Sequence, residues 1–179
     1  MTRQLNKKVC LLGDFSVGKT SMIRRFVFNM FDDKYLSTIG VKVSRKTVIV
    51  PQTDGGVELM IMLWDLAGSQ DFNQMQASYY RGAAGAMLVC DLTRLDTIEN
   101  LHNYANNFRK INPNAPLILA ANKYDLIQNN LFSEAQQNMQ NQIKDIATQL
   151  NMPYYFTSAK TGEAVETVFR HLAERLVSN

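Results

Sequence analysis

The strongest constraint on this chain is the stretch 13–20, Gly-Asp-Phe-Ser-Val-Gly-Lys-Thr, which has the spacing Gly-x4-Gly-Lys-Thr. An apolar run precedes it at 8–12, and apolar residues at helical spacing follow it. Glycines let several backbone N–H groups converge on one anion, the lysine adds a positive charge, and a threonine hydroxyl suits a magnesium ion. The stretch therefore predicts a phosphate-binding loop between a buried strand and a helix. The alternative is a glycine-rich turn without a ligand, and the rest of the chain decides between them.

The composition is that of an ordinary globular protein. The 179 residues are most simply one domain, 1–179, long enough to bury a core without disulfides or metals. The hydrophobic fraction of 46% and the charged fraction of 20% are typical of such a domain. The net charge of +3 suits an anionic ligand, but lysine and arginine are scattered along the chain. The sequence therefore argues against a nucleic-acid partner.

The sequence also bears on the cellular compartment. Cys10 and Cys90 lie in apolar, strand-like runs, which is typical of buried free thiols in a reducing environment. No apolar run approaches the roughly 18 residues of a membrane span. There is no apolar signal core near Met1, and the last residues, Leu-Val-Ser-Asn, hold no cysteine for prenylation. We expect a cytoplasmic monomer, and peripheral association with intracellular membranes stays open because no lipidation motif is present in this sequence.

Periodicity predicts alternating strands and helices. We expect strands at 8–12, 41–50, 57–64, 84–90, 117–121 and 154–156, and helices after the phosphate-binding loop and over 98–111, 139–150 and 165–176. The turn 51–56 contains Asp-Gly and predicts a hairpin between the second and third strands. The Gln- and Asn-rich stretch 128–142 is expected to form the solvent face of a helix. This order predicts an α/β fold with a six-stranded, mainly parallel sheet, one antiparallel strand and helices on both faces.

Polar residues follow several of the predicted strands. Ligands of such sheets bind beyond the carboxyl ends of the strands, so these residues should meet at one site. Asp65 closes the third strand, where its carboxylate suits a Mg²⁺ opposite Thr20, and the N–H of Gly68 follows. Asn122 and Asp125 follow the fifth strand. A carboxylate that accepts two N–H groups of a purine edge, beside an amide, selects guanine over adenine, so the sequence predicts a site for a guanine nucleotide with Mg²⁺.

Five motifs occur along nearly the whole chain. They are the loop 13–20, Thr38, Trp-Asp-Leu-Ala-Gly at 64–68, Asn-Lys-Tyr-Asp at 122–125 and Ser-Ala-Lys at 158–160. With these motifs the chain resembles a small GTPase of the Ras superfamily. The segments Ser-Thr-Ile-Gly-Val at 37–41 and Tyr-Tyr-Arg-Gly-Ala at 79–83, together with Trp-Asp at 64–65, are most similar to the Rab branch.

The resemblance implies a P-loop NTPase fold, GTP or GDP with Mg²⁺ as cofactors, effector proteins that bind two switch loops, an exchange factor, and a role in vesicle trafficking. Thr38 would join the Mg²⁺ only when a γ-phosphate is bound, and Ala159 would offer its N–H to the guanine oxygen. Phe31 would lie edge-on to the guanine, and Tyr35 would close over the phosphates. For these two aromatic residues the alternative is that they only pack their loop onto the domain.

The resemblance also assigns roles to individual residues. The implied nucleotide-binding residues are Gly13, Asp14, Phe15, Ser16, Val17, Gly18, Lys19, Thr20, Ser21, Phe31, Tyr35, Thr38, Gly68, Asn122, Lys123, Asp125, Ser158, Ala159 and Lys160. The implied Mg²⁺ ligands are Thr20, Thr38 and Asp65, and the residues implied in hydrolysis are Lys19, Thr38, Gly68, Ser69 and Gln70.

Two positions depart from the family pattern. After Asp-x-Ala-Gly the family has a glutamine that positions the attacking water, whereas this chain has Ser69, with Gln70 one place later. Serine is shorter by about three heavy atoms and does not span the same gap. Two places after Gly13 the family has a small residue, but here Phe15 would crowd the space for the glutamine and for an arginine finger. These changes predict slow GTP hydrolysis and resistance to activating proteins. The alternative is that Gln70 takes over the role and Phe15 points outward.

The sequence leaves three functions open. The first is a guanine-nucleotide switch with residual hydrolysis. The second is a binding module locked on GTP, with negligible hydrolysis. The third, an adenine-specific kinase or ATPase, is disfavoured because the stretch 122–125 is selective for guanine.

Overall fold

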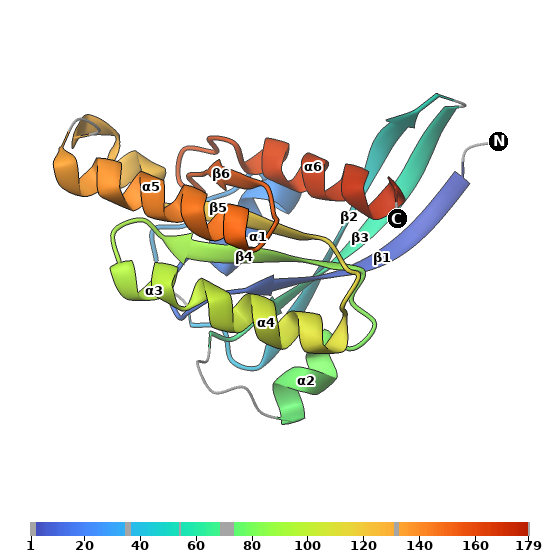
Figure 1. Ribbon diagram of the computed structural model, residues 1–179. Coiled ribbons are helices and arrows are strands. Elements are labelled where there is room, and N and C mark those ends of the chain that lie inside the picture. The colour runs from blue at the N-terminus through green and yellow to red at the C-terminus, as the bar shows by residue number, and fades with distance from the viewer. Residues whose placement is uncertain (1–2, 35–36, 54, 69–73, 131–132, 179) are drawn as a thin grey trace.

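The computed structural model describes residues 3–34, 37–53, 55–68, 74–130 and 133–178. Figure 1 shows strands alternating with helices along most of the chain. The elements are β1 (Arg3–Leu12), α1 (Lys19–Phe28), β2 (Val41–Gln52), β3 (Gly55–Leu66), α2 (Gln74–Tyr80), β4 (Gly85–Asp91), α3 (Leu95–Glu99), α4 (Leu101–Ile111), β5 (Leu117–Asn122), the 3₁₀ helices η1 (Tyr124–Leu126) and η2 (Gln128–Asn130), α5 (Glu134–Gln149), β6 (Tyr154–Phe156) and α6 (Val165–Ser178).

Six strands form one sheet in the order β2-β3-β1-β4-β5-β6. β1 pairs in parallel with β3 and β4, β4 with β5, and β5 with β6, whereas β2 is antiparallel to β3. Every residue of β4 and β5 is buried, which explains why these strands read as continuous apolar runs. The predicted mainly parallel sheet with one antiparallel strand is confirmed.

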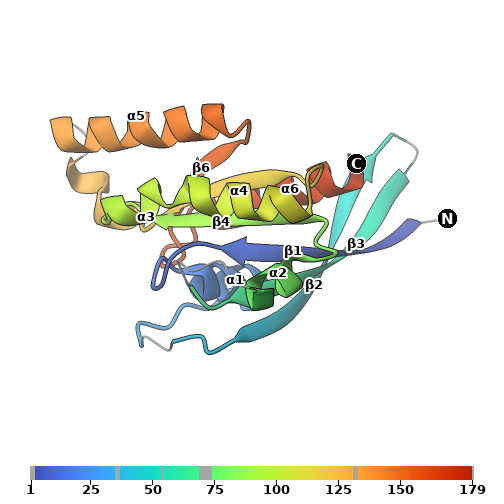
Figure 2. The same ribbon diagram turned by 60° about the horizontal axis from the view of Figure 1, so that its bottom comes forward.

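Helices cover both faces of this sheet (Figures 1 and 2). On one face α1 and α6 pack together, and the rings of Phe26 and Phe169 stack with centroids 4.1 Å apart. On the other face α3, α4 and α5 bury apolar side chains such as Phe108 and Ile143. None of the helices in the described part of the chain combines the length and hydrophobicity needed to cross a bilayer.

The ends of the elements divide between two sides of the molecule. In Figure 1 the end of β2, the start of β3, the start of β1 and the end of α6 lie on the same side. The carboxyl ends of the parallel strands point the opposite way. The loops that follow them are therefore gathered at one end of the sheet, as expected for a doubly wound fold.

The helix predicted over 98–111 is interrupted at Asn100, which separates α3 from α4. The Asn100 side chain donates to the Asp14 carboxylate with an Nδ2–Oδ2 distance of 2.7 Å. The interruption thus lies where the helix meets the loop after β1. Hydrophobic periodicity is continuous across this point, so it did not reveal the break.

Other boundaries also differ from the prediction. Pro51 pairs with Gly56 and Gln52 with Gly55, so β2 and β3 extend into the predicted 51–56 turn. The polar stretch 128–142 is not a single helix, because η2 ends at Asn130 and α5 begins only at Glu134. Helix α2 was not predicted, since it is short and, among its residues, only Tyr80 is fully buried.

Candidate functional site

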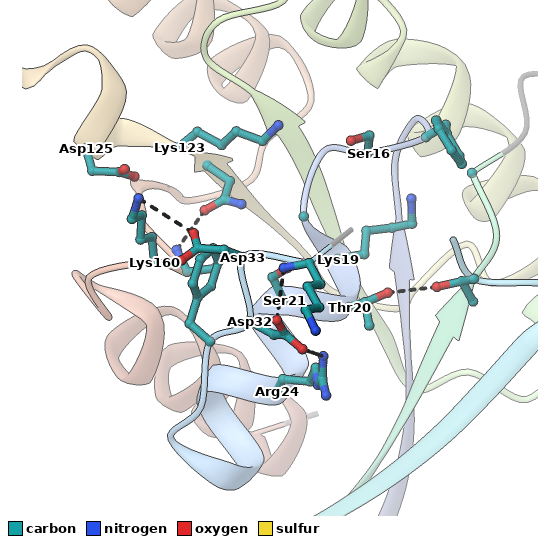
Figure 3. Close-up of a pocket in the computed structure, with 18 of the residues that line it drawn as sticks. Ser16, Lys19, Thr20, Ser21, Arg24, Asp32, Asp33, Lys123, Asp125 and Lys160 are labelled. Atoms are coloured by element: carbon teal, nitrogen blue, oxygen red, sulfur yellow. Dashed lines mark hydrogen bonds and ion pairs between the residues drawn. The ribbon is translucent and has the colours of Figure 1, made fainter. Parts of the chain in front are cut away.

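A cavity of about 330 Å³ lies at the end of the sheet where the parallel strands terminate, which is within the usual size range of ligand pockets (Figure 3). Its walls come from the loops after β1, β3, β5 and β6, from α1 and from the segment before β2. The predicted site residues that line it are Phe15, Ser16, Gly18, Lys19, Thr20, Ser21, Phe31, Thr38, Gly68, Asn122, Lys123, Asp125, Ala159 and Lys160. Residues of all five motifs thus meet at one place.

Other predicted residues do not line the cavity. Gly13, Asp14, Val17, Asp65 and Ser158 are buried and are not among the lining residues, and Tyr35, Ser69 and Gln70 are outside the described residues. The Asp14 carboxylate points into the fold, where it accepts hydrogen bonds from Asn100 and from the Tyr104 hydroxyl, at 2.7 and 2.8 Å. Its side chain therefore anchors the loop to Asn100, between α3 and α4, and to Tyr104 of α4.

The loop after β1 has the geometry of an anion site. Gly18 has φ +104°, and a Cβ there would lie 2.2 Å from Nδ2 of Asn122, so only glycine fits. Lys19 is 6% exposed, and its ammonium donates to the carbonyls of Gly13 and Asp14 at 2.7 and 2.8 Å. Burial lowers the pKa of Lys19 to about 8, and the nearby Asp65 and Asp14 carboxylates oppose the shift. A buried ammonium at the N-terminus of α1 attracts an anionic ligand.

Three oxygen-bearing side chains meet where α1 begins and β3 ends. The Thr20 hydroxyl is 2.5 Å from Oδ2 of Asp65 and 2.8 Å from the Thr38 hydroxyl, and Thr38 is 3.4 Å from the same Oδ2. The other carboxylate oxygen, Oδ1 of Asp65, is buried and has no hydrogen-bond partner in the described structure. Burial raises the pKa of Asp65, partly offset by the hydrogen bond from Thr20. Hard oxygen ligands around an unpaired buried carboxylate oxygen fit a Mg²⁺ ion.

Asn122 links the predicted guanine-binding motif to the phosphate-binding loop. It is 2% exposed, and its Nδ2 donates to the carbonyl of Val17 at 3.0 Å. Its Oδ1 accepts the N–H of Ala159 at 3.1 Å. This N–H was predicted to face a guanine oxygen, so a guanine would have to share it with Asn122. The Asn122 side chain therefore lines the cavity and also joins the loop after β1 to the loop after β6.

Asp125 and Lys123 each have a partner beside the cavity. The Asp125 carboxylate accepts a hydrogen bond from the buried Ser158 hydroxyl at 2.6 Å, so Ser158 orients Asp125 instead of lining the cavity. The Lys123 ammonium is 2.6 Å from the carboxylate of Asp91, which is 1% exposed. Asp91 was not predicted from the sequence, although it closes a buried strand in the same way as Asp65 does.

Two ion pairs lie at the rim of the cavity (Figure 3). Asp33 is 3.7 Å from Lys160, and Asp32 is 3.9 Å from Arg24. The neighbouring Phe31 both lines the cavity and packs against the core near α1 and α6. Arg24, Asp32, Asp33, Lys34, Leu66 and Leu126 also line the cavity and were not predicted. Asp32, Asp33 and Lys34 are consecutive, but no sequence spacing links them to Arg24, Leu66 or Leu126, which they meet only in the fold.

The segment after β3 contacts the phosphate-binding loop at Phe15, through Gly68. A Cβ on Gly68 would lie 2.3 Å from the Phe15 backbone nitrogen, so glycine permits the close approach. The Phe15 carbonyl accepts a hydrogen bond from Arg94 at 2.8 Å. The Phe15 side chain lines the cavity but is 52% exposed. Its ring therefore lies at the mouth of the cavity.

Comparison with known proteins agrees with this geometry. The sequence of residues 8–178 matches the family model of the Ras family. Human Ras-related protein Rab-22A is 35% identical over 172 residues, which cover 96% of this chain and 84% of the relative. Dictyostelium discoideum Rab-32A is 35% identical over 178 residues, 96% of this chain and 78% of the relative, and Candida albicans SEC4 is 32% identical over 167 residues, 93% and 75%. This chain belongs to the Ras superfamily of small GTPases and is Rab-like.

Proposed function

We propose that the protein is a guanine-nucleotide switch that binds GTP and GDP with Mg²⁺ through a single G domain, 1–179. The observation that carries this proposal is the convergence of three sets of residues on one cavity. They are the phosphate-binding loop, Thr20 and Thr38 with the buried Asp65 carboxylate that both contact, and the stretch 122–125. The first set suits the phosphates, the second suits the Mg²⁺ ion, and the third suits the guanine base. Together they would hold a whole guanine nucleotide with its metal ion.

Different residues of the cavity would bind the phosphates, the base and the metal ion. Lys19 and the backbone N–H groups of the loop 13–20 would hold the phosphates, and Asp125 would accept N–H groups from the guanine edge. Thr20, Thr38 and Asp65 would hold the Mg²⁺, which neutralises phosphate charge when bound. As a Rab-like protein, the chain would expose effector surfaces around Thr38 and Gly68 in the GTP state, accept an exchange factor, and act as a monomer in vesicle trafficking at intracellular membranes.

Titration calorimetry tests nucleotide binding directly. A sample confirmed free of nucleotide should release heat with GDP and GTP in the presence of magnesium, and ATP at the same concentration should give none. Heat with ATP alone would instead support an adenine-specific kinase or ATPase. A lack of heat with all three nucleotides would refute the proposal.

Thr38 should distinguish GTP from GDP. Replacing it with alanine removes one hydroxyl from the Thr20 and Asp65 cluster, and a lost hydrogen bond or ligand of this kind costs about 1 kcal/mol. We expect about fivefold weaker binding of a nonhydrolysable GTP analogue and an unchanged affinity for GDP. Equal losses for the two nucleotides would contradict the switch role of Thr38. Thr148→Ala is a matched control, because that hydroxyl contacts the Lys144 carbonyl on α5, away from the cavity.

We also propose that GTP hydrolysis is slow, because Ser69 replaces the family's glutamine and Phe15 lies at the mouth of the cavity. A GTP-locked binding module is the second candidate function, favoured by the same two residues. Exchange kinetics separate the candidates. A switch should trade its nucleotide within minutes when an exchange factor is present, whereas a locked module should retain the nucleotide with which it was purified.

A further inference from the structure

Arg25 joins two elements of the nucleotide site without lining the cavity itself. It lies in the last turn of α1 and is half-buried. Its Nε donates to the Ala159 carbonyl at 2.9 Å, and its Nη2 donates to the Lys160 carbonyl at 2.5 Å. Its Nη1 lies 3.3 Å from both oxygens of Asn29, the residue that caps α1. The planar guanidinium offers five donors in a fixed arrangement, so one side chain holds two consecutive carbonyls and the end of a helix.

The sheet holds only the start of the loop 158–160. Thr157 donates its N–H to the Ala121 carbonyl at 2.8 Å and accepts the N–H of Tyr124 at 3.0 Å. Ser158 donates its N–H to the carbonyl of Glu163 at 3.0 Å. The Ser158 carbonyl accepts the N–H of Gly162 at 2.8 Å. The two carbonyls after it, those of Ala159 and Lys160, are the ones that Arg25 holds. The guanidinium therefore continues the anchoring of the loop at the point where the loop leaves the sheet.

Arg25 also closes a ring of contacts that includes Asn122 and Ala159, two residues predicted to bind the base. Asn122 connects the Val17 carbonyl, just before α1, to the N–H of Ala159. Arg25 connects the far end of α1 to the carbonyl of that same Ala159. The peptide groups on both sides of Ala159 are thus fixed, one from each end of α1. Asn122 thus contacts the Ala159 N–H directly, whereas Arg25 acts on the orientation of Ala159 through the peptide group that follows it.

On the basis of the proposed guanine-nucleotide binding, we propose that Arg25 is a positioning residue for the base. It holds the loop 158–160 so that the Ala159 N–H faces the guanine oxygen, and it thereby slows nucleotide release. A different role would be purely structural, since a cation in the last turn of a helix stabilises the helix. The two roles differ in what they predict for a nucleotide whose guanine oxygen is changed.

The test measures release of ribose-labelled GDP and of ribose-labelled 6-thioguanosine diphosphate, in which sulfur, a weak acceptor, replaces the guanine oxygen. Arg25→Ala should release GDP about tenfold faster than the wild type, which corresponds to the loss of one well-placed hydrogen bond to the base. It should release the 6-thio nucleotide less than about threefold faster. Arg25→Lys keeps the positive charge but loses the planar set of guanidinium donors, so its rate of GDP release should lie between those of the wild type and Arg25→Ala.

Arg175→Ala is the matched control. Arg175 also reaches from a helix to a backbone carbonyl, because its Nη1 donates to the Leu117 carbonyl at 2.9 Å. Leu117 begins β5, whereas Asn122 ends it, so this contact lies at the opposite end of the sheet from the cavity. GDP release from Arg175→Ala should stay within about twofold of the wild type, even if its melting temperature falls.

The outcomes are distinct. Equal acceleration for both nucleotides, or none for GDP, would overturn the positioning role. If Arg25→Ala does not fold, the same comparison of nucleotides is made with Arg25→Lys, where equal acceleration overturns the role and acceleration confined to GDP supports it. Failure of the wild-type protein to bind GDP would refute the proposed function itself, and it is measured first.

Discussion

Asp125→Ala is expected to weaken GDP binding by roughly 10²- to 10⁴-fold. In the proposed function the carboxylate would accept two N–H groups from the guanine edge, and hydrogen bonds to a charged group contribute about 1.5 to 3 kcal/mol each. It is already oriented in the structure, because the buried Ser158 hydroxyl donates to one of its oxygens at 2.6 Å. A preoriented acceptor gives up little entropy on binding, so most of its interaction energy should appear in the affinity. Displacement of labelled GDP measures the loss.

The effect on base selectivity checks the reason for this loss. Inosine diphosphate lacks the exocyclic amine of guanine, so it forms one fewer hydrogen bond to the carboxylate, and Asp125→Ala should weaken its binding much less. Asp145→Ala removes an exposed carboxylate from α5 and should leave both affinities unchanged. Equal losses for GDP and for inosine diphosphate would show that Asp125 does not read the amine.

The sequence predicted the sheet and the residues at its strand ends because both follow from local patterns. Buried parallel strands read as apolar runs, and the last residue of such a run must face the ligand side of a doubly wound sheet. The position of Asp65 and of Asn122 at the ends of two such runs was enough to predict both as site residues. The same rule, applied to β4, also identifies Asp91, whose carboxylate pairs with Lys123.

The missed residues act through contacts between distant parts of the chain. Arg25 meets the carbonyl of Ala159, and Tyr104 meets Asp14, at sequence separations that no local pattern encodes. The same limit applies to the break at Asn100, since the partner of its side chain belongs to another element. The phosphate-binding motif named Asp14 correctly as part of the loop, but it did not reveal that its carboxylate is used for anchoring.

Ser69→Gln combined with Phe15→Ser is expected to accelerate single-turnover GTP hydrolysis by roughly 10- to 100-fold, the size of effect that one well-placed group has on a transition state. The glutamine would restore a side chain long enough to orient the attacking water. The serine would clear the mouth of the cavity, where the Phe15 ring is 52% exposed. The two substitutions serve one reacting group, so their combined effect should exceed the product of the single effects. Preloading the protein with GTP separates the hydrolysis rate from nucleotide affinity.

Phe15→Ser should keep the contact from Arg94, because that contact goes to the backbone carbonyl, which any residue provides, and the melting temperature of the variant checks that the fold is retained. A competing explanation is that Gln70 already positions the water. In that case Gln70→Ala would slow the wild-type enzyme and the double substitution would add nothing, whereas slow hydrolysis caused by Ser69 and Phe15 predicts that Gln70→Ala has no effect. The two single substitutions, their combination and Gln70→Ala, measured with the same preloaded nucleotide, therefore decide which of Phe15, Ser69 and Gln70 sets the rate of hydrolysis.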